Sequence, residues 1–233
     1  IYSRKDKSII ISEEARVALG ADKTEFVPNK LIKVILQAPV NMIWNGGIGT
    51  FMKSSKQTNL EVGDRANDSI RINANTCRAA MICEGGNLGL TRDARVEYAL
   101  LGGQINTDFI DNSAGVDCSD HEVNLKILLN SALNSNRLTL KQRNQLLSKL
   151  TDEVANSVLN NNQQQNRNIA QTVYDSMENL ELYTNYINHQ EELNRFNRKT
   201  ESLPDNQILL NRQKEKKGLT RPEVSTLIAN SKN

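Results

Sequence analysis

The sequence is poor in the residues from which metal and nucleophilic sites are often built. Of its 233 residues only two are histidine, three are cysteine and one is tryptophan. Cys77, Cys83 and Cys118 are odd in number and lack C-x-x-C spacing, and the two histidines lie far apart in the chain. These residues therefore do not compose a zinc site, and we expect reduced thiols.

Long apolar runs and charge of one sign are also absent. No apolar run approaches the roughly 20 residues that span a bilayer, and the first residues lead into no signal-like segment, so we expect a cytoplasmic protein without a membrane partner. The 29 basic and 27 acidic side chains are mixed along the chain and give a net charge of +2. Nucleic acid is not an expected partner, because it requires a one-sided basic surface.

Length and composition are those of one ordinary core with a second, smaller body, since 38% of the 233 residues are hydrophobic. The chain begins with Ile1 rather than methionine, and a new helix begins near Pro222, close to its end. We therefore expect it to be a piece of a longer polypeptide.

Capping and periodicity signals predict alternating helices and strands in the first half of the chain. Ser12 and Thr58 have N-cap chemistry, Pro28 begins a helix that ends before Pro39, and Thr91 begins one that stops at Gly102. The predicted helices at the two N-caps cover residues 12–19 and 59–73. Short apolar runs predict strands over 40–44, 79–83 and 105–110.

Strands that alternate with helices of this length pair in parallel, because parallel neighbours need a crossover. We therefore predict an α/β fold, a partial doubly wound parallel sheet (a Rossmann-like half), followed by an all-helical C-terminal region. The predicted domains are residues 1–135 and 136–233. Within the helical region Thr139 is a predicted N-cap, and Pro204 marks a break. The Asn/Gln tract at 160–166 is either a linker or part of one bent helix.

Three Gly/Asn-rich turns follow the predicted strands, at the edge where ligands bind in open α/β sheets. In the first, Asn45, Gly46 and Gly47 allow either a tight turn or close approach of a ligand to the backbone. In the second, an acid and an amide flank two glycines: Glu84, Gly85, Gly86 and Asn87. An amide there suits a ribose hydroxyl or a carboxamide, or satisfies its own turn.

The third turn, at 112–115, opens a polar segment with three carboxylates and His121 within six residues. We interpret the S-x-x-E pattern at 119–122 as a helix N-cap and not as a metal site. A hydroxyl and amides at a helix start would also hold a substrate carboxylate. Cys118 as a nucleophile has only His121 as a candidate base, and we interpret His189 as a solvated surface residue.

Taken together, these turns resemble the large, NAD-specific bacterial glutamate dehydrogenase family. The resemblance is carried by four phrases in order, WNGGIGT, GDRAND, EGGNLGLT and INTDFIDNSAGVDCSDHEVN, and covers nearly all of residues 38–130. It implies NAD as cofactor and the oxidative deamination of L-glutamate to 2-oxoglutarate and ammonia. The phrase LTRPEVS near the end of the chain resembles the family less distinctively.

The resemblance also implies roles for particular residues. Asn87 and Asn112 match asparagines that meet the nucleotide, Asn112 near the nicotinamide ribose, and Ser119 matches the serine that meets the substrate's side-chain carboxylate. Asn67 and Asn73 match two asparagines of a preceding helix. Ser113 and Ala114 depart from the shorter pattern of smaller relatives.

The family's catalytic lysine and aspartate and its glycine-rich dinucleotide turn have no counterpart in these residues. We therefore predict no catalytic residue and no metal site here, and an inactive fragment of an active parent that works with its remaining segments. We expect a homo-oligomer. The alternative is that the helices after Ser131 form an assembly or regulatory module. The residues alone do not distinguish NAD from NADP, since the acid that recognises a ribose hydroxyl lies near an earlier strand.

Overall fold

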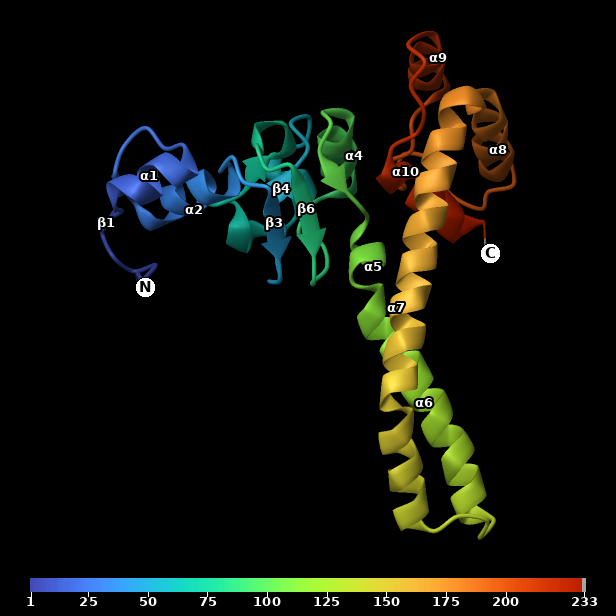
Figure 1. The fold of residues 1–233 in the computed structure, drawn as a ribbon. Helices are drawn as coiled ribbons and strands as arrows, with labels where there is room; N and C mark the ends of the chain where they lie inside the picture. The colour runs from blue at the N-terminus through green and yellow to red at the C-terminus, as the bar shows by residue number, and fades with distance from the viewer. Residues whose placement is uncertain (232–233) are drawn as a thin grey trace. The chain divides into compact units, whose positions relative to one another are not determined.

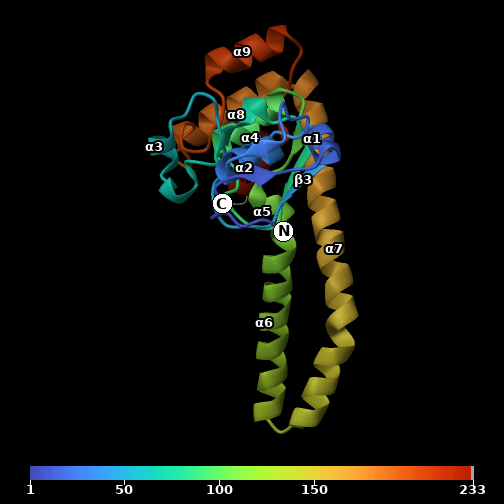
Figure 2. The ribbon, with the colours of Figure 1, turned by 90° about the vertical axis from the view of Figure 1, so that its left-hand side faces the viewer.

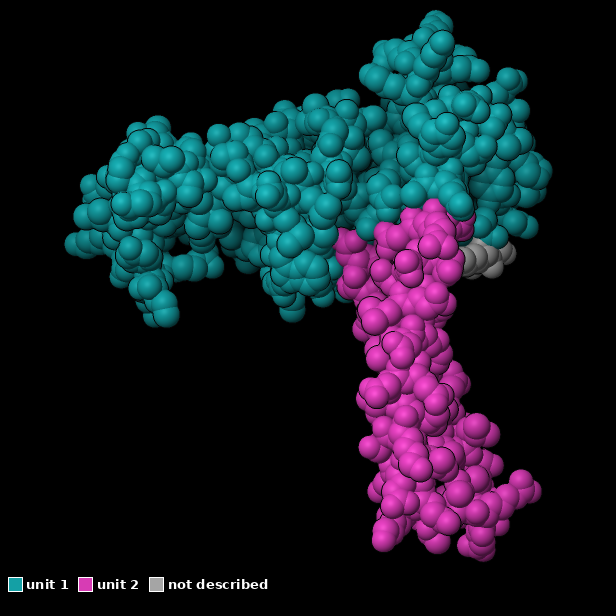
Figure 3. Space-filling view, in the orientation of Figure 1, with its two compact units in different colours: residues 1–108, 169–233 teal, residues 109–168 magenta. Residues whose placement is uncertain are grey.

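The computed structural model describes residues 1–231, which divide into two compact units (Figure 3). Unit 1 comprises residues 1–108 and those from Ile169 onward, and unit 2 comprises residues 109–168. The chain is an α/β protein: every strand in the described residues lies before Asp108, and the elements that follow are helices. The boundary predicted at residue 135 concerns domains of a longer protein and stays a prediction.

The first elements of unit 1 form a small layer with its own core. Strands β1 (Ile9–Ile10) and β2 (Glu25–Phe26) pair antiparallel, and helices α1 (Glu13–Leu19) and α2 (Pro28–Leu36) follow them in the chain. The Ser12 hydroxyl accepts a hydrogen bond from the Ala15 amide at 3.2 Å, and Gly20 ends α1 at a φ of 59°. Both predicted helices are confirmed.

The central sheet is parallel and has the order β3-β6-β7. Figure 1 shows its neighbouring strands β3 and β6. Its strands are β3 (Met42–Asn45), β6 (Met81–Glu84) and β7 (Gln104–Ile105), and α4 (Arg92–Leu100) crosses from β6 to β7. The Thr91 hydroxyl caps α4 as predicted. Ile82, Ala94, Tyr98 and Ile105 are buried between the sheet and α4.

Two of the three predicted strands are confirmed with shifted ends, whereas the prediction of a strand over 105–110 is wrong after Ile105. The chain there enters the short helix α5 (Asp108–Asp111). The carbonyl oxygen of Asn106 accepts from Arg95 at 3.2 Å, and the carboxylate of Asp108 accepts from the Leu88 amide at 3.0 Å. These hydrogen bonds hold residues 106–108 away from β6, so strand pairing ends at Ile105.

The helix predicted over 59–73 is also wrong in length. Thr58 caps a helix as predicted and forms a capping box with Glu61, but α3 spans only Asn59–Val62 because Gly63 turns left-handed at a φ of 75°. The chain then passes through η1 (Arg65–Asn67) into β5 (Ile72–Asn73), which pairs in parallel with β4 (Met52–Lys53), and on to η2 (Ala74–Thr76).

Unit 2 is a helical hairpin. Helix α6 (Ser113–Asn134) runs beside the first part of α7 (Leu140–Glu178), as both views show (Figures 1 and 2). The Thr139 hydroxyl accepts from the Gln142 amide at 3.3 Å, so the predicted cap is confirmed. The tract at 160–166 lies inside α7, so the linker alternative is wrong and the helical one holds.

The remaining helices of unit 1 are α8 (Leu180–Glu192), α9 (Asn206–Lys214) and α10 (Arg221–Asn230). Pro204 lies in the break before α9, as predicted. Arg212 and the buried Glu223 join α9 to α10 through two hydrogen bonds of 2.8 and 2.9 Å. Among the described residues no helix combines the length and the apolar character needed to cross a membrane.

Candidate functional site

Two of the predicted turns meet at the carboxyl ends of β3 and β6. The parallel register places Asn45 opposite Glu84, and the Gly85 amide donates to the Asn45 carbonyl oxygen at 3.0 Å. A Cβ on Gly86 would lie 2.9 Å from the Gly47 carbonyl oxygen, which only glycine avoids without a shift. The turns at 45–47 and 84–87 therefore form one continuous edge, as the sequence predicts for parallel strands.

Glu84 faces inward from this edge. Its side chain is fully buried and accepts a hydrogen bond of 3.1 Å from the Asn45 side-chain amide. Its second carboxylate oxygen pairs with the guanidinium of Arg95 on α4, a side chain that is only 2% exposed. The carboxylate is thus committed to internal contacts, while the backbone of the same turn stays at the surface.

Arg95 is a residue that the sequence reading missed. Besides Glu84 it contacts the loop after β7, donating to the Asn106 carbonyl oxygen at 3.2 Å and lying 3.7 Å from the Asp108 carboxylate. In the T-R-D-A-R run Arg95 stands among other charged residues of a helix, which is typical of an exposed surface. Its burial beneath the turns becomes clear only when β6 pairs with β7 and α4 connects the two strands.

The surface of the edge combines glycine backbone, an amide and an aromatic ring. Gly46, Gly47, Gly85 and Asn87 are exposed, and Trp44 is 62% exposed. A Cβ on Gly85 would lie 2.8 Å from Cζ2 of Trp44, so a side chain at this position would displace the indole ring. Such a surface can approach a flat or phosphorylated ligand closely. The only tryptophan of the chain, next to paired glycines, was a signal for this site that the sequence reading did not use.

Asn112 and Ser119 lie in unit 2, Asn112 directly before α6 and Ser119 within it. Asn112 occupies the N-cap position and, with Phe109, Ser113, Asp117 and residues of α7, lines a cavity of about 530 Å³. The prediction that a helix begins at Ser119 is wrong: α6 begins at Ser113, and Ser119 is an exposed residue within it. Hydrogen bonds from the Asn162 side chain to Ser113 Oγ at 2.9 Å and to the Ile110 carbonyl at 3.0 Å hold the helix start six residues earlier.

Cys118 is exposed on α6, so it does not lie at a helix start either. The imidazole of its candidate base, His121, lies 3.5 Å from the Asp117 carboxylate. Within residues 1–231 the structure contains no group of three or more His, Cys, Asp or Glu side chains arranged to hold a metal ion.

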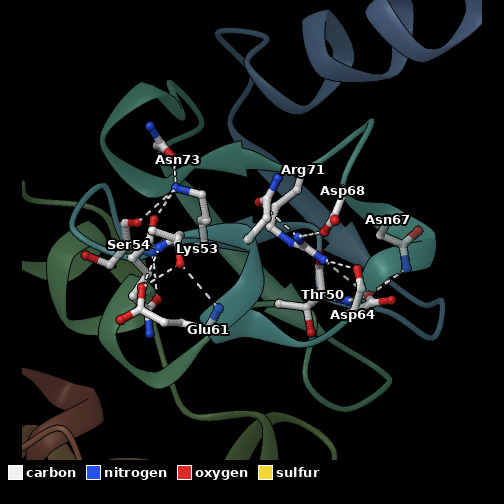
Figure 4. A network of polar contacts seen from close by, with 12 residues as sticks. Thr50, Lys53, Ser54, Glu61, Asp64, Asn67, Asp68, Arg71 and Asn73 are labelled. Atoms are coloured by element: carbon white, nitrogen blue, oxygen red, sulfur yellow. Dashed lines mark hydrogen bonds and ion pairs between the residues drawn. The ribbon is translucent and has the colours of Figure 1, made fainter.

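The GDRAND phrase builds a polar network around Arg71 (Figure 4). The buried Arg71 donates to the carbonyl oxygens of Thr50 and Asp64 and pairs with Asp68. Asp64 accepts from the Thr50 amide at 2.8 Å and from the Asn67 side chain at 2.7 Å, and these bonds hold the pKa of its carboxyl below the usual value. Arg71 thus fixes the loop that follows the first glycine turn.

Asn73, the second asparagine of that region, accepts a hydrogen bond of 2.6 Å from Lys53 (Figure 4). The Lys53 ammonium also donates to the Gln57 carbonyl oxygen at 2.7 Å. Neither Asn67 nor Asn73 lies in the helix that was predicted to contain them, because that helix ends at Val62.

Comparison with known proteins gives one consistent result. A family described as "Bacterial NAD-glutamate dehydrogenase, catalytic domain" matches residues 1–172. Curated proteins named NAD-specific glutamate dehydrogenase are similar over the entire chain: 46% identical over 232 residues in Pseudomonas aeruginosa, 44% over 238 in Mycobacterium tuberculosis and 43% over 232 in Halomonas elongata. The chain spans only 14 to 15% of the length of these relatives.

Proposed function

Because this chain belongs to the family of bacterial NAD-glutamate dehydrogenases, we propose that it supplies one wall of the nucleotide and substrate site of such an enzyme. The reaction is the oxidative deamination of L-glutamate to 2-oxoglutarate and ammonia. The observation that carries the proposal is the edge at which the turns at 45–47 and 84–87 meet. The relatives support the proposal because all three are named NAD-specific glutamate dehydrogenase.

The proposed fold of this wall is half of a doubly wound, Rossmann-like sheet. Its support is the parallel β3-β6-β7 order and the crossover through α4. In such sheets nucleotides bind beyond the carboxyl ends of the strands, where both glycine turns lie. The strands that would complete the sheet belong to other segments of the longer protein.

The residues at the edge fit NAD. Nothing lies within 4 Å of a Cβ position at Gly47, so a ribose or a phosphate can approach the backbone closely there, while Gly85 and Gly86 make room for Trp44 and the Gly47 carbonyl oxygen in the same edge. The amide of Asn87 can donate and accept at a hydroxyl or carboxamide. Asn45 and Glu84 belong to the same site, and we assign the buried Glu84 carboxylate the role of holding Asn45 and not of touching the ribose. When bound, NAD supplies the acceptor for the hydride that leaves glutamate.

Asn112 and Ser119 complete the proposed set, Asn112 toward the nicotinamide ribose and Ser119 toward the glutamate side-chain carboxylate. The 22-residue length of α6 changes the chemistry proposed for Ser119. Backbone amides inside a helix are already bonded, so the serine would contribute its hydroxyl alone. The charge of the carboxylate would then be met by groups from other segments.

No residue of this chain is proposed as catalytic. Proton transfer in the deamination requires a general acid and base within hydrogen-bond reach of the substrate, and the resemblance locates the family's lysine and aspartate outside these residues. We therefore expect the purified 233-residue chain to give no glutamate-dependent NAD reduction. Activity of that chain alone would contradict the assignment.

Substitutions in the full-length protein test the assignment. For Ser119→Ala we expect a KM for glutamate that rises about tenfold, as for loss of one hydrogen bond to a charged group, with the KM for NAD unchanged. Asn87→Ala should do the reverse. Ser131→Ala, another exposed hydroxyl of α6, is the matched control and should leave both constants within twofold. Unchanged kinetics for Ser119→Ala and Asn87→Ala would remove both residues from the site.

A second candidate function is assembly, favoured by the surface of α6. This helix contains no buried residue, and Val116, Val123 and Ile127 form an exposed apolar stripe along it, each more than half exposed. We propose that the stripe contributes to a homo-oligomer of the full-length enzyme. Light scattering of Val123→Glu/Ile127→Glu should report a lower mass than the unchanged protein, and an equal mass would remove this role.

A further inference from the structure

We propose that Arg95 is a positioning residue of the nucleotide site, because its guanidinium holds the three loops that follow β3, β6 and β7 in one arrangement. The inference deepens the proposed function and rests on it. The resemblance to the family gives no role to this arginine, and its buried side chain does not reach the exposed edge of the sheet. It would act through Glu84 and Asn45, which orient the turns at that edge.

The first two loops are reached through Glu84. Arg95 pairs with one carboxylate oxygen of Glu84, and the other oxygen accepts 3.1 Å from Asn45 Nδ2. Asn45 begins the turn with Gly46 and Gly47, and Glu84 begins the turn with Gly85 and Gly86. The orientation of both turns therefore depends on a carboxylate that is itself oriented by the guanidinium.

The third loop is reached directly. Arg95 Nη1 donates to the Asn106 carbonyl oxygen at 3.2 Å, and Nη2 lies 3.7 Å from Asp108 Oδ2. The same Asp108 oxygen accepts from the Leu88 amide at 3.0 Å, which ties the loop after β7 back to the end of the second glycine turn. The contacts form a closed circuit from Glu84 through Arg95 and Asp108 to Leu88.

Burial and geometry explain why an arginine fits this role. Glu84 is 0% and Arg95 2% exposed, so neither charge is compensated by water. A buried ion pair is seldom more stable than a well-packed apolar pair, and its distinctive contribution is orientation. A planar guanidinium with five donors can bind several acceptors in fixed directions, which a lysine ammonium does not reproduce.

The circuit extends to α10. Arg221 Nε donates to the side-chain oxygen of Asn106 at 2.8 Å, and Arg221 is the arginine of the LTRPEVS phrase. One asparagine thus joins Arg95 by its backbone and Arg221 by its side chain. Arg221 of α10 thus contacts the loop after β7 through Asn106.

The test uses the full-length enzyme with Arg95→Met, Arg95→Lys and Glu84→Gln. If Arg95 acts through Glu84, the KM for NAD rises at least tenfold in Arg95→Met and in Glu84→Gln, while the KM for glutamate stays within about twofold. The double variant should be no worse than the worse single variant, because the two residues act as one unit. For Arg95→Lys, the increase in the logarithm of the KM for NAD should be more than half of the increase seen in Arg95→Met.

The matched control is a second buried Arg–Glu pair of the described residues, Arg212 and Glu223, which has the same separation of 11 residues. Arg212→Met should lower thermal stability as Arg95→Met does, yet leave the ratio of the two KM values unchanged. If Arg95→Met proves insoluble, Glu84→Gln with hydrogen exchange at the Gly85 and Leu88 amides carries the test, and faster exchange at both is expected.

The outcomes separate the two proposals. An inactive wild type, or Asn87→Ala without effect on NAD, would count against the proposed function itself. An active wild type in which Asn87→Ala weakens NAD but Arg95→Met and Glu84→Gln change both KM values equally, or neither, overturns the positioning role. The selective rise in the KM for NAD, absent from Arg212→Met, supports it.

Discussion

Asn45 and Glu84 are opposed across the parallel strands β3 and β6, and the amide of the first donates a 3.1 Å hydrogen bond to the buried carboxylate of the second. The bond links two glycine turns that lie 39 residues apart in the chain. Because the Glu84 carboxylate is fully buried, position 45 requires a side chain that can donate a hydrogen bond to it.

We expect Asn45→Asp to destabilise the chain more than Asn45→Ala. Alanine removes one hydrogen bond and costs about 1 kcal/mol, whereas aspartate places a second negative charge against a buried carboxylate and costs about 3 kcal/mol at pH 8. Chemical denaturation of both variants at pH 8 measures the two costs, and an Asn45→Asp variant that is no less stable than Asn45→Ala would contradict the explanation.

Gly89→Ala should disturb the same pair from another direction. A Cβ on the buried Gly89 would overlap the Asn45 side-chain nitrogen and the Glu84 carboxylate oxygen. Overpacking of this kind costs about 1 to 3 kcal/mol, and here the groups that must move are those of the turns. Thermal denaturation should therefore show a lower Tm.

Gly115→Ala is the control for that substitution, because a Cβ at Gly115, which is inside α6, would meet nothing within 4 Å beyond its chain neighbours and the backbone of its own helix. A methyl group there should be neutral or stabilise the helix by up to about 1 kcal/mol. A change at Gly89 no more destabilising than the change at Gly115 would contradict the explanation that overlap with the Asn45–Glu84 pair determines the cost.

Local signals allowed much of this fold to be predicted. Caps at Ser12, Thr58, Thr91 and Thr139 are decided by hydrogen bonds within three residues of each position, and all of them are present. The parallel pairing of β3 with β6 followed from the crossover rule. These features depend on neighbouring residues, which a single sequence displays in full.

Distant contacts account for what could not be predicted. The helix after Thr58 ends at Val62, where Gly63 turns left-handed, and the segment that follows is organised by Arg71, which donates to the carbonyl oxygen of Thr50, 21 residues earlier, as well as to that of the nearby Asp64. The start of α6 at Ser113 depends on Asn162, 49 residues later. The burial of Arg95 depends on the packing of α4 beneath the turns, which its neighbours in the sequence do not indicate.

Tyr98 makes stability depend on alkaline pH. Its hydroxyl donates to the Ala79 carbonyl oxygen at 2.6 Å, and burial, with smaller effects of Cys77 and Cys83, raises the pKa of Tyr98 to about 12 from 10. Because the folded state holds the proton more tightly, this contribution to stability is complete below pH 10 and is lost as the pH rises to about 12.

The Tyr98→Phe variant should therefore be about 1 kcal/mol less stable at pH 8, and its stability should fall less steeply between pH 10 and 12 than that of the wild type. Denaturant midpoints across that range measure the slope. Tyr174→Phe alters a ring that is 66% exposed and should retain the wild-type slope. A Tyr98→Phe slope equal to the wild-type one would show that other groups control alkaline unfolding.

Asn162 anchors the start of α6, and its loss should loosen the helix that follows Asn112 and contains Ser119. Its side-chain nitrogen donates to the Ile110 carbonyl oxygen and to Ser113 Oγ, and its side-chain oxygen accepts from Asn166 at 3.2 Å, so Asn162→Ala should cost about 1 to 2 kcal/mol. Hydrogen exchange at the amides of residues 113–117 should accelerate, whereas the amides of β3 and β6 should keep their rates. Asn160→Ala changes an exposed asparagine of the same tract and should stay within about 0.5 kcal/mol of the wild type. Equal effects of the two alanines would mean that helix propensity, and not the anchoring bonds, decides the stability of this segment.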